Sequence, residues 1–303
     1  MSDLSIIVVT YNSGEIVLDC LNSLMTASVG LSTEIIIVDN NSQDGTPERI
    51  QERFSQVRLI SNPDNLGFAS ANNSGLSVAV GRYLLLVNPD VTVEPNALKV
   101  MIETLDEETR VGIVGPRTLD GQGNIALTVR GEFTPFILLW QYWGLNVFLP
   151  VEQYQRQSRN DTAPFEATWL QASCLMFRRE VYEQVGGLDT GFFMFCEEPD
   201  FCERAAQAGW RTVYVPQARI THFESTTVSR YPLLKMRHYH LSPLYYFRKR
   251  HRPMSVLVLK LGFIIELSVK YFLRVIQNAL KPHDSLRARI QAYPIVIKEI
   301  WHY

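Results

Sequence analysis

The stretch that decides the fold is Leu84-Leu85-Leu86-Val87-Asn88-Pro89-Asp90. Its consecutive apolar residues predict a buried strand, and the turn that follows places one carboxylate, Asp90, at the carboxyl end of that strand. Ligands of open α/β sheets bind at this end of the strands. An Asp close to an Asn at such a position can bind a divalent cation, and the cation can in turn bind a diphosphate. Taken alone, the same residues also fit an ordinary polar turn.

Strands and helices alternate along the chain on both sides of this stretch. Apolar and β-branched runs predict strands at 4–10, 34–38, 57–60, 83–87, 111–114, 125–129, 168–177 and 212–215, and predict helices after a Ser13 cap, from about Thr46 and at 67–80. This alternation is typical of right-handed βαβ crossovers and of a mostly parallel, Rossmann-like sheet with helices on both faces. No G-x-G-x-x-G sequence follows the first strand, which favours a single nucleotide over a dinucleotide as the ligand.

Polar residues gather where successive predicted strands end. Because the carboxyl ends of parallel strands share one edge of a sheet, we expect these side chains to lie together. Gly67 opens a predicted helix whose free backbone N–H groups can face a phosphate. A single Asn is more often a helix cap, but a set of polar residues along one edge indicates a binding site. The candidate residues are Thr10, Tyr11, Asn12, Asp39, Asn41, Asn65, Gly67, Asn72, Asn88 and Asp90.

An acidic segment further along the chain supplies candidate catalytic residues. Glu197-Glu198-Pro199-Asp200 follows an aromatic cluster and predicts carboxylates at the start of a helix, where Pro199 suits the first turn. Repulsion between the adjacent Glu197 and Glu198 should raise one pKa, and a carboxylate beside bulky aromatics can act as a general base. The alternative is an acidic helix start that the helix dipole favours.

One histidine is a candidate metal ligand. His222 follows an apolar, β-like segment and can turn its imidazole toward the edge that carries Asp90. Asp90 and His222, with Asn88 directly or through water, would leave coordination positions open for diphosphate oxygens. A lone histidine is more often structural.

Together these segments resemble family 2 glycosyltransferases with the GT-A fold, and in particular bacterial rhamnosyltransferases of cell-wall and O-antigen assembly. The strings that match lie in the same order and span about residues 4–230. They are Val8-Val9-Thr10-Tyr11-Asn12, Val38-Asp39-Asn40-Asn41-Ser42-Gln43-Asp44-Gly45-Thr46, Asn65-Leu66-Gly67-Phe68, Asn88-Pro89-Asp90 and Glu197-Glu198-Pro199-Asp200.

The resemblance implies an inverting sugar transfer from a nucleoside-diphosphate donor to a hydroxyl of a glycan or lipid-linked acceptor. It favours rhamnose and dTDP-rhamnose, with a UDP-sugar as the other possible donor. In such enzymes the loop of residues 10–12, together with Asp39, contacts the base and ribose of the nucleotide. Asn88 and Asp90 occupy the place of the metal-binding Asp-x-Asp motif, with Asn in place of the first Asp. This match implies Mg²⁺ or Mn²⁺ as the cofactor.

The same resemblance assigns the catalytic base. Glu198 stands where the family's Glu-Asp-x-Asp motif has its second acidic residue. Because Glu replaces Asp here, the side chain is one methylene longer, and Glu197 remains an alternative base. Asp200, the last acidic residue of the motif, is the third candidate catalytic residue.

The C-terminal part of the chain differs in charge from the rest. Residues 230–303 hold 14 Lys and Arg against 3 Asp and Glu, whereas residues 1–229 hold 15 against 28. This uneven distribution of charge indicates that the basic part contacts an anionic surface. Both nucleic acid and anionic lipid are such surfaces. We therefore expect a GT-A catalytic domain at 1–230, with halves at 1–110 and 111–230, and a basic helical region at 231–303.

An apolar stretch at 256–276 follows the basic run Arg248-Lys249-Arg250-His251-Arg252. Its charged residues are too many for a helix that crosses lipid, and we expect an amphipathic helix lying in the interface with its basic face toward anionic headgroups. The alternative is a helix packed on the catalytic domain or on another subunit. The charged residues are Lys260, Glu266, Lys270 and Arg274, of which the last three lie near one helical face.

Composition limits the other classes of function. A chain of 303 residues is long enough for one large α/β domain with an appendage. The four cysteines lack zinc-site spacing and the start of the chain lacks a signal-peptide pattern, so we expect a cytoplasmic protein at the inner face of the cytoplasmic membrane. The alternative enzyme is a nucleotidyltransferase acting on sugar phosphates. It would normally show a Gly- and basic-rich phosphate loop near the N-terminus, and the sequence has none there. A nucleic-acid-binding protein would leave the acidic sheet edge unexplained, so we expect no nucleic-acid partner. The aromatic residues 132–165 fit either an acceptor-side lid or a satellite hydrophobic cluster.

Overall fold

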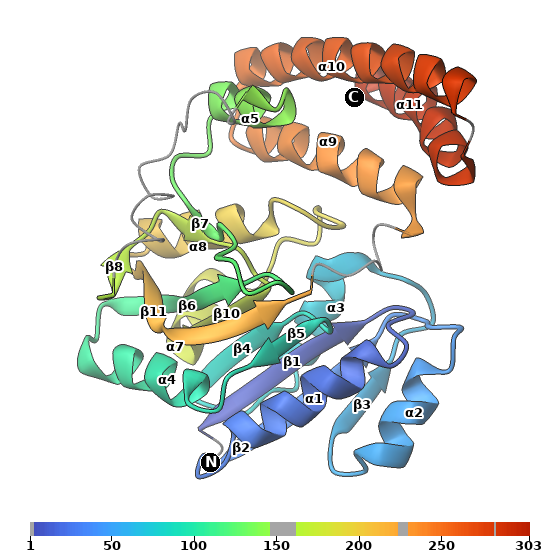
Figure 1. Cartoon of the computed structure of the whole chain (residues 1–303). Helices are drawn as coiled ribbons and strands as arrows, with labels where there is room; N and C mark the ends of the chain where they lie inside the picture. The colour runs from blue at the N-terminus through green and yellow to red at the C-terminus, as the bar shows by residue number, and fades with distance from the viewer. Residues whose placement is uncertain (1–2, 146–161, 224–229, 282) are drawn as a thin grey trace. The chain divides into compact units, whose positions relative to one another are not determined.

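The computed structural model describes residues 3–145, 162–223, 230–281 and 283–303, which fall into two compact units (Figure 1). The N-terminal unit comprises Met1–Gly131, Glu152–Thr190 and Glu197–Ser225. The C-terminal unit comprises Glu132–Val151, Gly191–Cys196 and Thr226–Tyr303. Two short segments of this unit therefore lie upstream of the boundary that we predict at residue 230.

The N-terminal unit is built on one large sheet. Its strands are β1 (Leu4–Thr10), β2 (Thr33–Asp39), β3 (Arg58–Ser61), β4 (Tyr83–Val87), β5 (Val91–Val93), β6 (Val111–Leu119), β8 (Phe165–Glu166), β10 (Cys174–Arg178) and β11 (Arg211–His222), while β7 (Val129–Arg130) and β9 (Trp169–Leu170) form a separate pair. Its helices are α1 (Ile16–Ala27), α2 (Thr46–Arg53), α3 (Gly67–Leu76), α4 (Ala97–Glu107), α7 (Arg179–Val185) and α8 (Glu197–Gln207).

The order of the large sheet brings several strand ends to one edge. It runs β3-β2-β1-β4-β10-β6-β11-β5, with β8 paired to β11. β1 is parallel to β2 and β4, and β2 is parallel to β3, so the carboxyl ends of these four strands lie at the same edge of the sheet. β10 runs antiparallel between β4 and β6, which places its amino end at this same edge.

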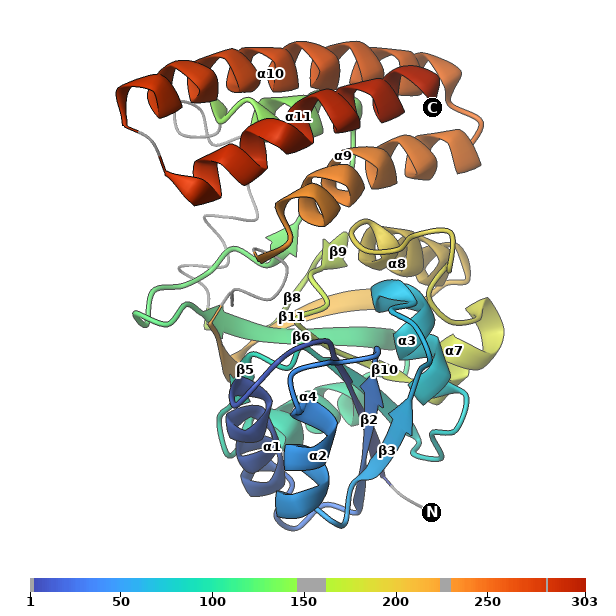
Figure 2. The ribbon, with the colours of Figure 1, turned by 90° about the vertical axis from the view of Figure 1, so that its right-hand side faces the viewer.

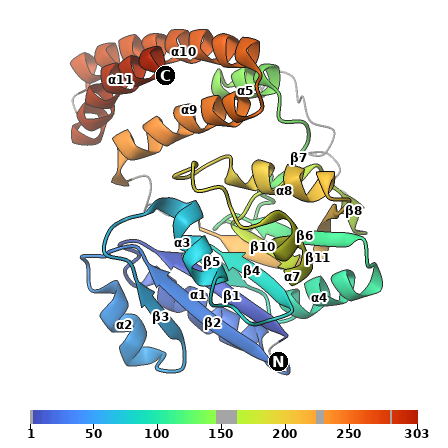
Figure 3. The ribbon, with the colours of Figure 1, turned by 180° about the vertical axis from the view of Figure 1, so that it is seen from behind.

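Helices cover both faces of the sheet, as Figure 2 shows from the side of β3. Alternate residues of β1 point to opposite faces: Ile6 and Val8 pack in a core with α1, α2 and α4, whereas Ile7 packs in a second core with α3, α7 and α8. Figure 3 shows the second of these faces. Because strands such as β1 and β4 are buried on both sides, they read as continuous apolar runs in the sequence.

The structure changes several of the predicted element boundaries. Ser13 does not cap α1, because the helix begins after Glu15 and the Ser13 hydroxyl accepts a hydrogen bond from the Tyr11 N–H instead (3.4 Å). The strand predicted at 212–215 continues to His222, where it pairs with β5. The helix predicted at 67–80 ends at Leu76, and of the strand predicted at 125–129 only the last residue belongs to a strand, β7.

The C-terminal unit is helical. Its helices are α5 (Pro135–Tyr142), α9 (Pro232–Lys249), α10 (Pro253–Leu280) and α11 (Asp284–His302). They share one hydrophobic core, in which Leu138 and Tyr142 of α5 pack with residues of α9, α10 and α11. For the described part of 132–165, the satellite-cluster interpretation is therefore correct for α5, whereas residues 146–161 lie outside the described residues.

Helix α10 has the opposite orientation to the one that the sequence predicts. Glu266 is 2% exposed and lies between His240 of α9 and Lys270, both within ion-pair distance. Lys270 also donates to the Tyr142 carbonyl of α5 (3.1 Å). The charged face of α10 is therefore turned toward its neighbouring helices, and the face turned outward is apolar. Within the described residues, no helix is both long and apolar enough to cross a membrane.

Candidate active site

The first cluster of polar side chains joins the ends of β1 and β2. Their register places Thr10 opposite Asp39, and the Thr10 hydroxyl donates to Asp39 Oδ1 (2.8 Å). The Ser42 hydroxyl donates to the same oxygen (2.5 Å), and the Ser42 N–H donates to Asp39 Oδ2 (2.9 Å). Asp39 is a buried carboxylate with charge-assisted hydrogen bonds, so its orientation at the sheet edge is fixed.

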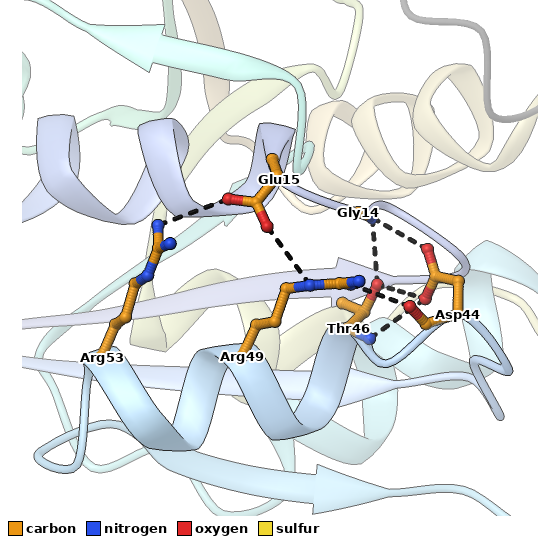
Figure 4. Close-up of polar contacts among 6 residues, drawn as sticks. All are labelled: Gly14, Glu15, Asp44, Thr46, Arg49 and Arg53. Atoms are coloured by element: carbon orange, nitrogen blue, oxygen red, sulfur yellow. Dashed lines mark hydrogen bonds and ion pairs between the residues drawn. The ribbon is translucent and has the colours of Figure 1, made fainter.

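The loop after β1 is held by the loop after β2. Asn12 adopts a left-handed backbone (φ 49°), its N–H donates to Ser42 Oγ (2.8 Å), and its Oδ1 accepts from the Gln43 N–H (2.8 Å). The Gly14 N–H donates to both Asp44 Oδ2 and Thr46 Oγ1 (3.0 Å each), as Figure 4 shows. The loop of residues 10–12 is therefore a preformed element of the edge.

Behind this loop, two ion pairs join α1 to α2. Glu15 accepts from Arg49 (3.2 Å) and from Arg53 (3.3 Å), and the Arg49 guanidinium also donates to the Asp44 carbonyl (2.8 Å) (Figure 4). These side chains are largely exposed, so each pair contributes little stability alone. They join the residue before α1 to the middle and the end of α2.

Asn40, which is not among the predicted site residues, connects β2 to α3. Its buried amide donates to Asn65 Oδ1 (3.3 Å) and to the Gly67 carbonyl (3.1 Å), and its Oδ1 accepts from Asn62 Nδ2 (2.8 Å). Asn65 Oδ1 also accepts from the Gly67 N–H (3.1 Å). Gly67 has a φ of 82°, which a side chain would strain, and α3 begins there as expected. The run Asp39-Asn40-Asn41-Ser42 was the available signal for Asn40 and for Ser42.

Two of the predicted nucleotide-binding residues differ in environment. Asn41 has a left-handed backbone (φ 67°) and accepts from the Gln43 side chain (2.8 Å), so it lies at the surface of the edge. Asn72 is fully buried in α3 and donates to the Phe68 carbonyl of its own helix (2.9 Å). The structure therefore places Asn72 inside the fold, apart from the partly exposed Tyr11, Asn12 and Asn41 of the loops.

Asp90 and His222 lie side by side although 132 residues separate them. β5 follows Asp90 directly and pairs antiparallel with the end of β11, which puts His222 opposite Val91. The Phe223 N–H donates to the Asp90 carbonyl (3.0 Å), and His222 Nε2 lies 3.1 Å from Asp90 Oδ1. Both side chains are mostly buried.

This pair is the candidate for the protein's part of a cation site. One carboxylate oxygen and one imidazole nitrogen, placed this close, can turn toward a single ion, and a mixed oxygen and nitrogen donor set suits Mn²⁺ better than Mg²⁺. Asn88 is partly buried two residues before Asp90. Among the described residues no group of three or more His, Cys, Asp or Glu side chains is placed to hold a metal.

The acidic segment begins α8 as predicted, with Pro199 in its first turn. Phe195 and Cys196, immediately before the helix, have φ values of 66° and 70°. Consecutive left-handed non-glycine residues are strained, and such strain concentrates at functional sites. Asp200 is fully buried and binds Arg204 (2.9 Å), which in turn donates to the Gly187 carbonyl (2.7 Å). Asp200 therefore fixes the loop that follows α7.

Glu197 and Glu198 have different surroundings. Glu197 is buried, and its Oε2 has no hydrogen-bond partner in the described part of the chain. Burial and the adjacent charge of Glu198 raise the pKa of Glu197 well above its ordinary value. Burial also raises the pKa of Glu198, but the Ala172 N–H and the positive charge of Arg130 oppose this rise. The pKa of Glu197 is therefore raised more strongly than that of Glu198, and the two carboxyl groups titrate as one interacting pair.

Glu198 and the turn that carries Asn88 are connected through two consecutive residues. Glu198 Oε1 accepts from the Ala172 N–H (3.4 Å), and the Ser173 carbonyl accepts from the Asn88 N–H (3.0 Å). β10 begins at the next residue and pairs there with Val87, the last residue of β4. The candidate base and the candidate cation-binding turn therefore lie at the same sheet edge, on either side of residues 172–173.

Comparisons with known proteins show which family and which fold the chain matches. The family model described as glycosyl transferase family 2 matches residues 5–186. The N-acetylglucosaminyl-diphospho-decaprenol L-rhamnosyltransferase of Mycobacterium tuberculosis is 30% identical over 82% of this chain and 85% of its own. The low-salt glycan biosynthesis hexosyltransferase Agl10 of Haloferax volcanii is 28% identical over 68% of this chain and 62% of its own.

Solved structures resemble the chain in fold. The mannosyltransferase PcManGT of Pyrobaculum calidifontis, solved with GDP-Man and Mn²⁺, has a TM-score of 0.55 at 16% identity, covering 98% of this chain and 86% of its own. Residues 1–349 of S. aureus TarS give a TM-score of 0.53 at 15% identity, covering 99% and 91%. The expected GT-A fold is thereby confirmed.

Proposed function

Because the chain belongs to glycosyl transferase family 2 and is a nucleotide-sugar-dependent glycosyltransferase of polysaccharide assembly, we propose that it transfers rhamnose from dTDP-rhamnose, with inversion, to a hydroxyl of a lipid-linked glycan. The name of the mycobacterial relative, which specifies both rhamnose and a polyprenyl-diphosphate acceptor, supports this choice. A UDP-sugar is the second candidate donor. Such an acceptor implies that the enzyme works in peripheral contact with an anionic membrane, at its cytoplasmic face.

The observation that carries the mechanism is the link through residues 172–173. It places Glu198 and the Asn88–Asp90 turn at one sheet edge, beside the loops of residues 10–12 and 39–42. A donor bound there would have its base and ribose at Thr10, Tyr11, Asn12 and Asp39, and its diphosphate toward Asp90. Asn41, Asn65 and Gly67 complete the set of proposed nucleotide contacts. We give Asn72 a supporting role because its amide is occupied within α3.

We assign the divalent cation, Mn²⁺ or Mg²⁺, to Asp90 and His222 with Asn88 as an additional oxygen donor. When bound, such an ion supplies positive charge that stabilises the leaving diphosphate. Asp90 would carry the negative charge of the site, and His222 Nε2, which lies 3.1 Å from Asp90 Oδ1, would offer its lone pair as the second protein ligand. The N-terminal N–H groups of α3, which begins at Gly67, can add to the stabilisation of the diphosphate.

Glu198 is the proposed general base. Its carboxylate removes the proton of the acceptor hydroxyl while that oxygen attacks the anomeric carbon on the face opposite the leaving nucleoside diphosphate. The bond between that carbon and the diphosphate oxygen breaks, and its electron pair leaves with the diphosphate. Glu197 keeps its proton and acts as a positioning residue, since a neutral neighbour allows Glu198 to remain ionised.

Slow donor hydrolysis by the purified chain tests the proposal. The chain is incubated with a panel of nucleotide sugars that includes dTDP-rhamnose, UDP-glucose and GDP-mannose, with Mn²⁺, with Mg²⁺ and with a chelator. We expect release of dTDP that requires the cation. Turnover of UDP- or GDP-sugars in preference to dTDP-rhamnose would contradict the proposed donor. Cation-independent hydrolysis would contradict the role given to Asp90.

A further inference from the structure

The outward face of α10 is an apolar surface in which Ser268 is the one exposed polar residue among the described side chains of the stripe, and we call it the α10 outer face. The residues recur every three or four positions along the 28-residue helix, so they form one stripe. Each of them is at least 39% exposed in the chain as described. They are Met254, Leu257, Val258, Leu261, Ile265, Val269, Phe272, Val275, Ile276 and Leu280.

No charged residue of α10 interrupts this stripe. Lys260 donates to the Trp301 carbonyl of α11 (3.0 Å), Glu266 is buried beside His240, and the half-exposed Lys270 pairs with Glu266. Arg274 donates to the Gln277 side chain (2.6 Å). A helix that places its charges against protein and leaves its apolar side open is the reverse of an ordinary surface helix. An exposed apolar patch of this extent marks an interaction surface.

An apolar groove runs along the inner border of this face, between α10 and α11. Its volume is about 360 Å³, and it is lined by Ile264, Tyr271, Pro294, Ile297, Lys298 and Trp301. Trp301 is 65% exposed. A Trp and a Tyr beside a Lys at the border of an apolar surface is the residue pattern of a membrane–water interface.

The charge around the outer face decides which partner fits. Arg248, Lys249 and Arg252 are exposed directly before α10, and Lys281 is exposed directly after it. Of the acidic residues in 230–303, Glu266 is buried and Glu299 binds Arg237, while the side chain of Asp284 lies outside the described residues. A second copy would bring two basic surfaces together, whereas an anionic bilayer offers apolar chains below and negative headgroups around.

We infer that the α10 outer face inserts between the acyl chains of an anionic bilayer, with the basic residues at both ends of α10 at the headgroups. This inference deepens the proposed membrane contact and rests on it. The contact is hydrophobic in its centre and electrostatic at its ends, which is the arrangement of an interfacial helix lying in the membrane plane.

Vesicle flotation of the full chain tests the inference. We compare the unchanged protein, the double variant Leu261→Glu/Phe272→Glu and a matched control, Val29→Glu/Val80→Glu. The control sites are also exposed apolar residues (83% and 60%), but they lie in the N-terminal unit. The vesicles contain phosphatidylcholine with or without phosphatidylglycerol. We expect the unchanged protein and the control to float with phosphatidylglycerol vesicles. We expect the α10 variant to bind these vesicles at least on the order of tenfold more weakly.

Donor hydrolysis by the same preparations separates this inference from the proposed function, because hydrolysis needs no membrane. Equal hydrolysis with lost flotation of the α10 variant supports the insertion. Equal flotation of all three proteins overturns it, as does a lipid-free dimer that the α10 variant dissociates. If no donor is hydrolysed while flotation follows α10, the insertion stands and the proposed function fails.

A labelled cysteine gives a second measurement that does not depend on the stability of the double variant. The four native cysteines are buried, so a cysteine at position 272 can be labelled selectively with an environment-sensitive dye. We expect a blue shift with phosphatidylglycerol vesicles at Phe272→Cys and none at Val80→Cys. The absence of a shift at position 272 would overturn the insertion.

Discussion

The two units of this protein use opposite arrangements of charge. In the N-terminal unit, apolar strands are buried and their polar residues emerge at the strand ends, where Thr10, Asp39 and Asp90 form the candidate site. In α10 of the C-terminal unit, Glu266 and Lys270 face the neighbouring helices and the apolar side faces outward. The comparison teaches that an amphipathic pattern identifies two faces of a helix but not which face the protein covers.

The largest expected effect concerns the carboxylate pair in the N-terminal unit. We expect Glu198→Gln to lower the turnover number by about 10²- to 10⁴-fold, because the amide cannot accept the acceptor's proton. Donor affinity should change little, since the nucleotide contacts lie on other loops. Steady-state transfer kinetics and calorimetric donor binding measure the two quantities.

Glu203→Gln, further along α8, is the control for this change. It should retain full turnover. If Glu198→Gln also keeps normal turnover, the base is Glu197, and the distinction between the protonated and the ionised partner is reversed.

The next prediction tests the buried charges of the C-terminal unit. Glu266→Ala leaves the buried His240 ring without its carboxylate partner and removes the carboxylate from the half-exposed Lys270, so it should cost about 1–3 kcal/mol of unfolding free energy. Glu299→Ala, which removes a partly exposed pair with Arg237, should cost about 1 kcal/mol or less. Urea unfolding with hydrogen exchange at α9 and α10 measures both. Equal losses would show that the inward charges of α10 are not a distinct feature.

Much of the N-terminal unit could be predicted from the sequence because its signals are local. Doubly buried strands are continuous apolar runs, and Asn-, Asp- and Gly-containing turns mark their ends. The meeting of Asp90 with His222 was predicted only as a possibility, since it depends on the long-range pairing of β5 with β11. Asn40 and Ala172 were missed because their roles arise from hydrogen bonds to residues distant in sequence.

The outward face of α10 could not be predicted for a related reason. Lys260, Glu266, Lys270 and Arg274 lie on one side of the helix, and a charged side ordinarily faces water. Here Tyr142 of α5, His240 of α9 and the Trp301 carbonyl of α11 supply partners for charges on that side. The sequence contains each partner, but only the packing of four helix segments shows that they meet.

A smaller effect is expected at the cation site. Asp90→Ala should weaken Mn²⁺-dependent donor binding by at least on the order of tenfold, because it removes the charged oxygen ligand. His222→Ala should act in the same direction with a smaller effect. Glu107→Ala, an exposed carboxylate of α4, is the control. Calorimetry with and without Mn²⁺ measures the donor affinity of each variant. Unchanged donor affinity in Asp90→Ala would contradict the assignment of Asp90 as a cation ligand.

The smallest effect concerns the pH dependence that the pair of glutamates creates. Burial and Glu198 raise the pKa of Glu197 above its ordinary value of 4.5, so the stability linked to its protonated form is fully present below pH 4.5 and is lost as the pH rises through the raised pKa. Glu197→Gln keeps a neutral side chain at every pH. Its unfolding free energy should therefore exceed that of the unchanged protein increasingly as the pH rises, by on the order of 1 kcal/mol for each unit by which the pKa is raised. Urea unfolding from pH 4 to 8 measures the difference, with Glu203→Gln as the control. Parallel curves for Glu197→Gln and the unchanged protein would show that Glu197 is ionised in the folded state, and Glu198 would then lose its neutral neighbour.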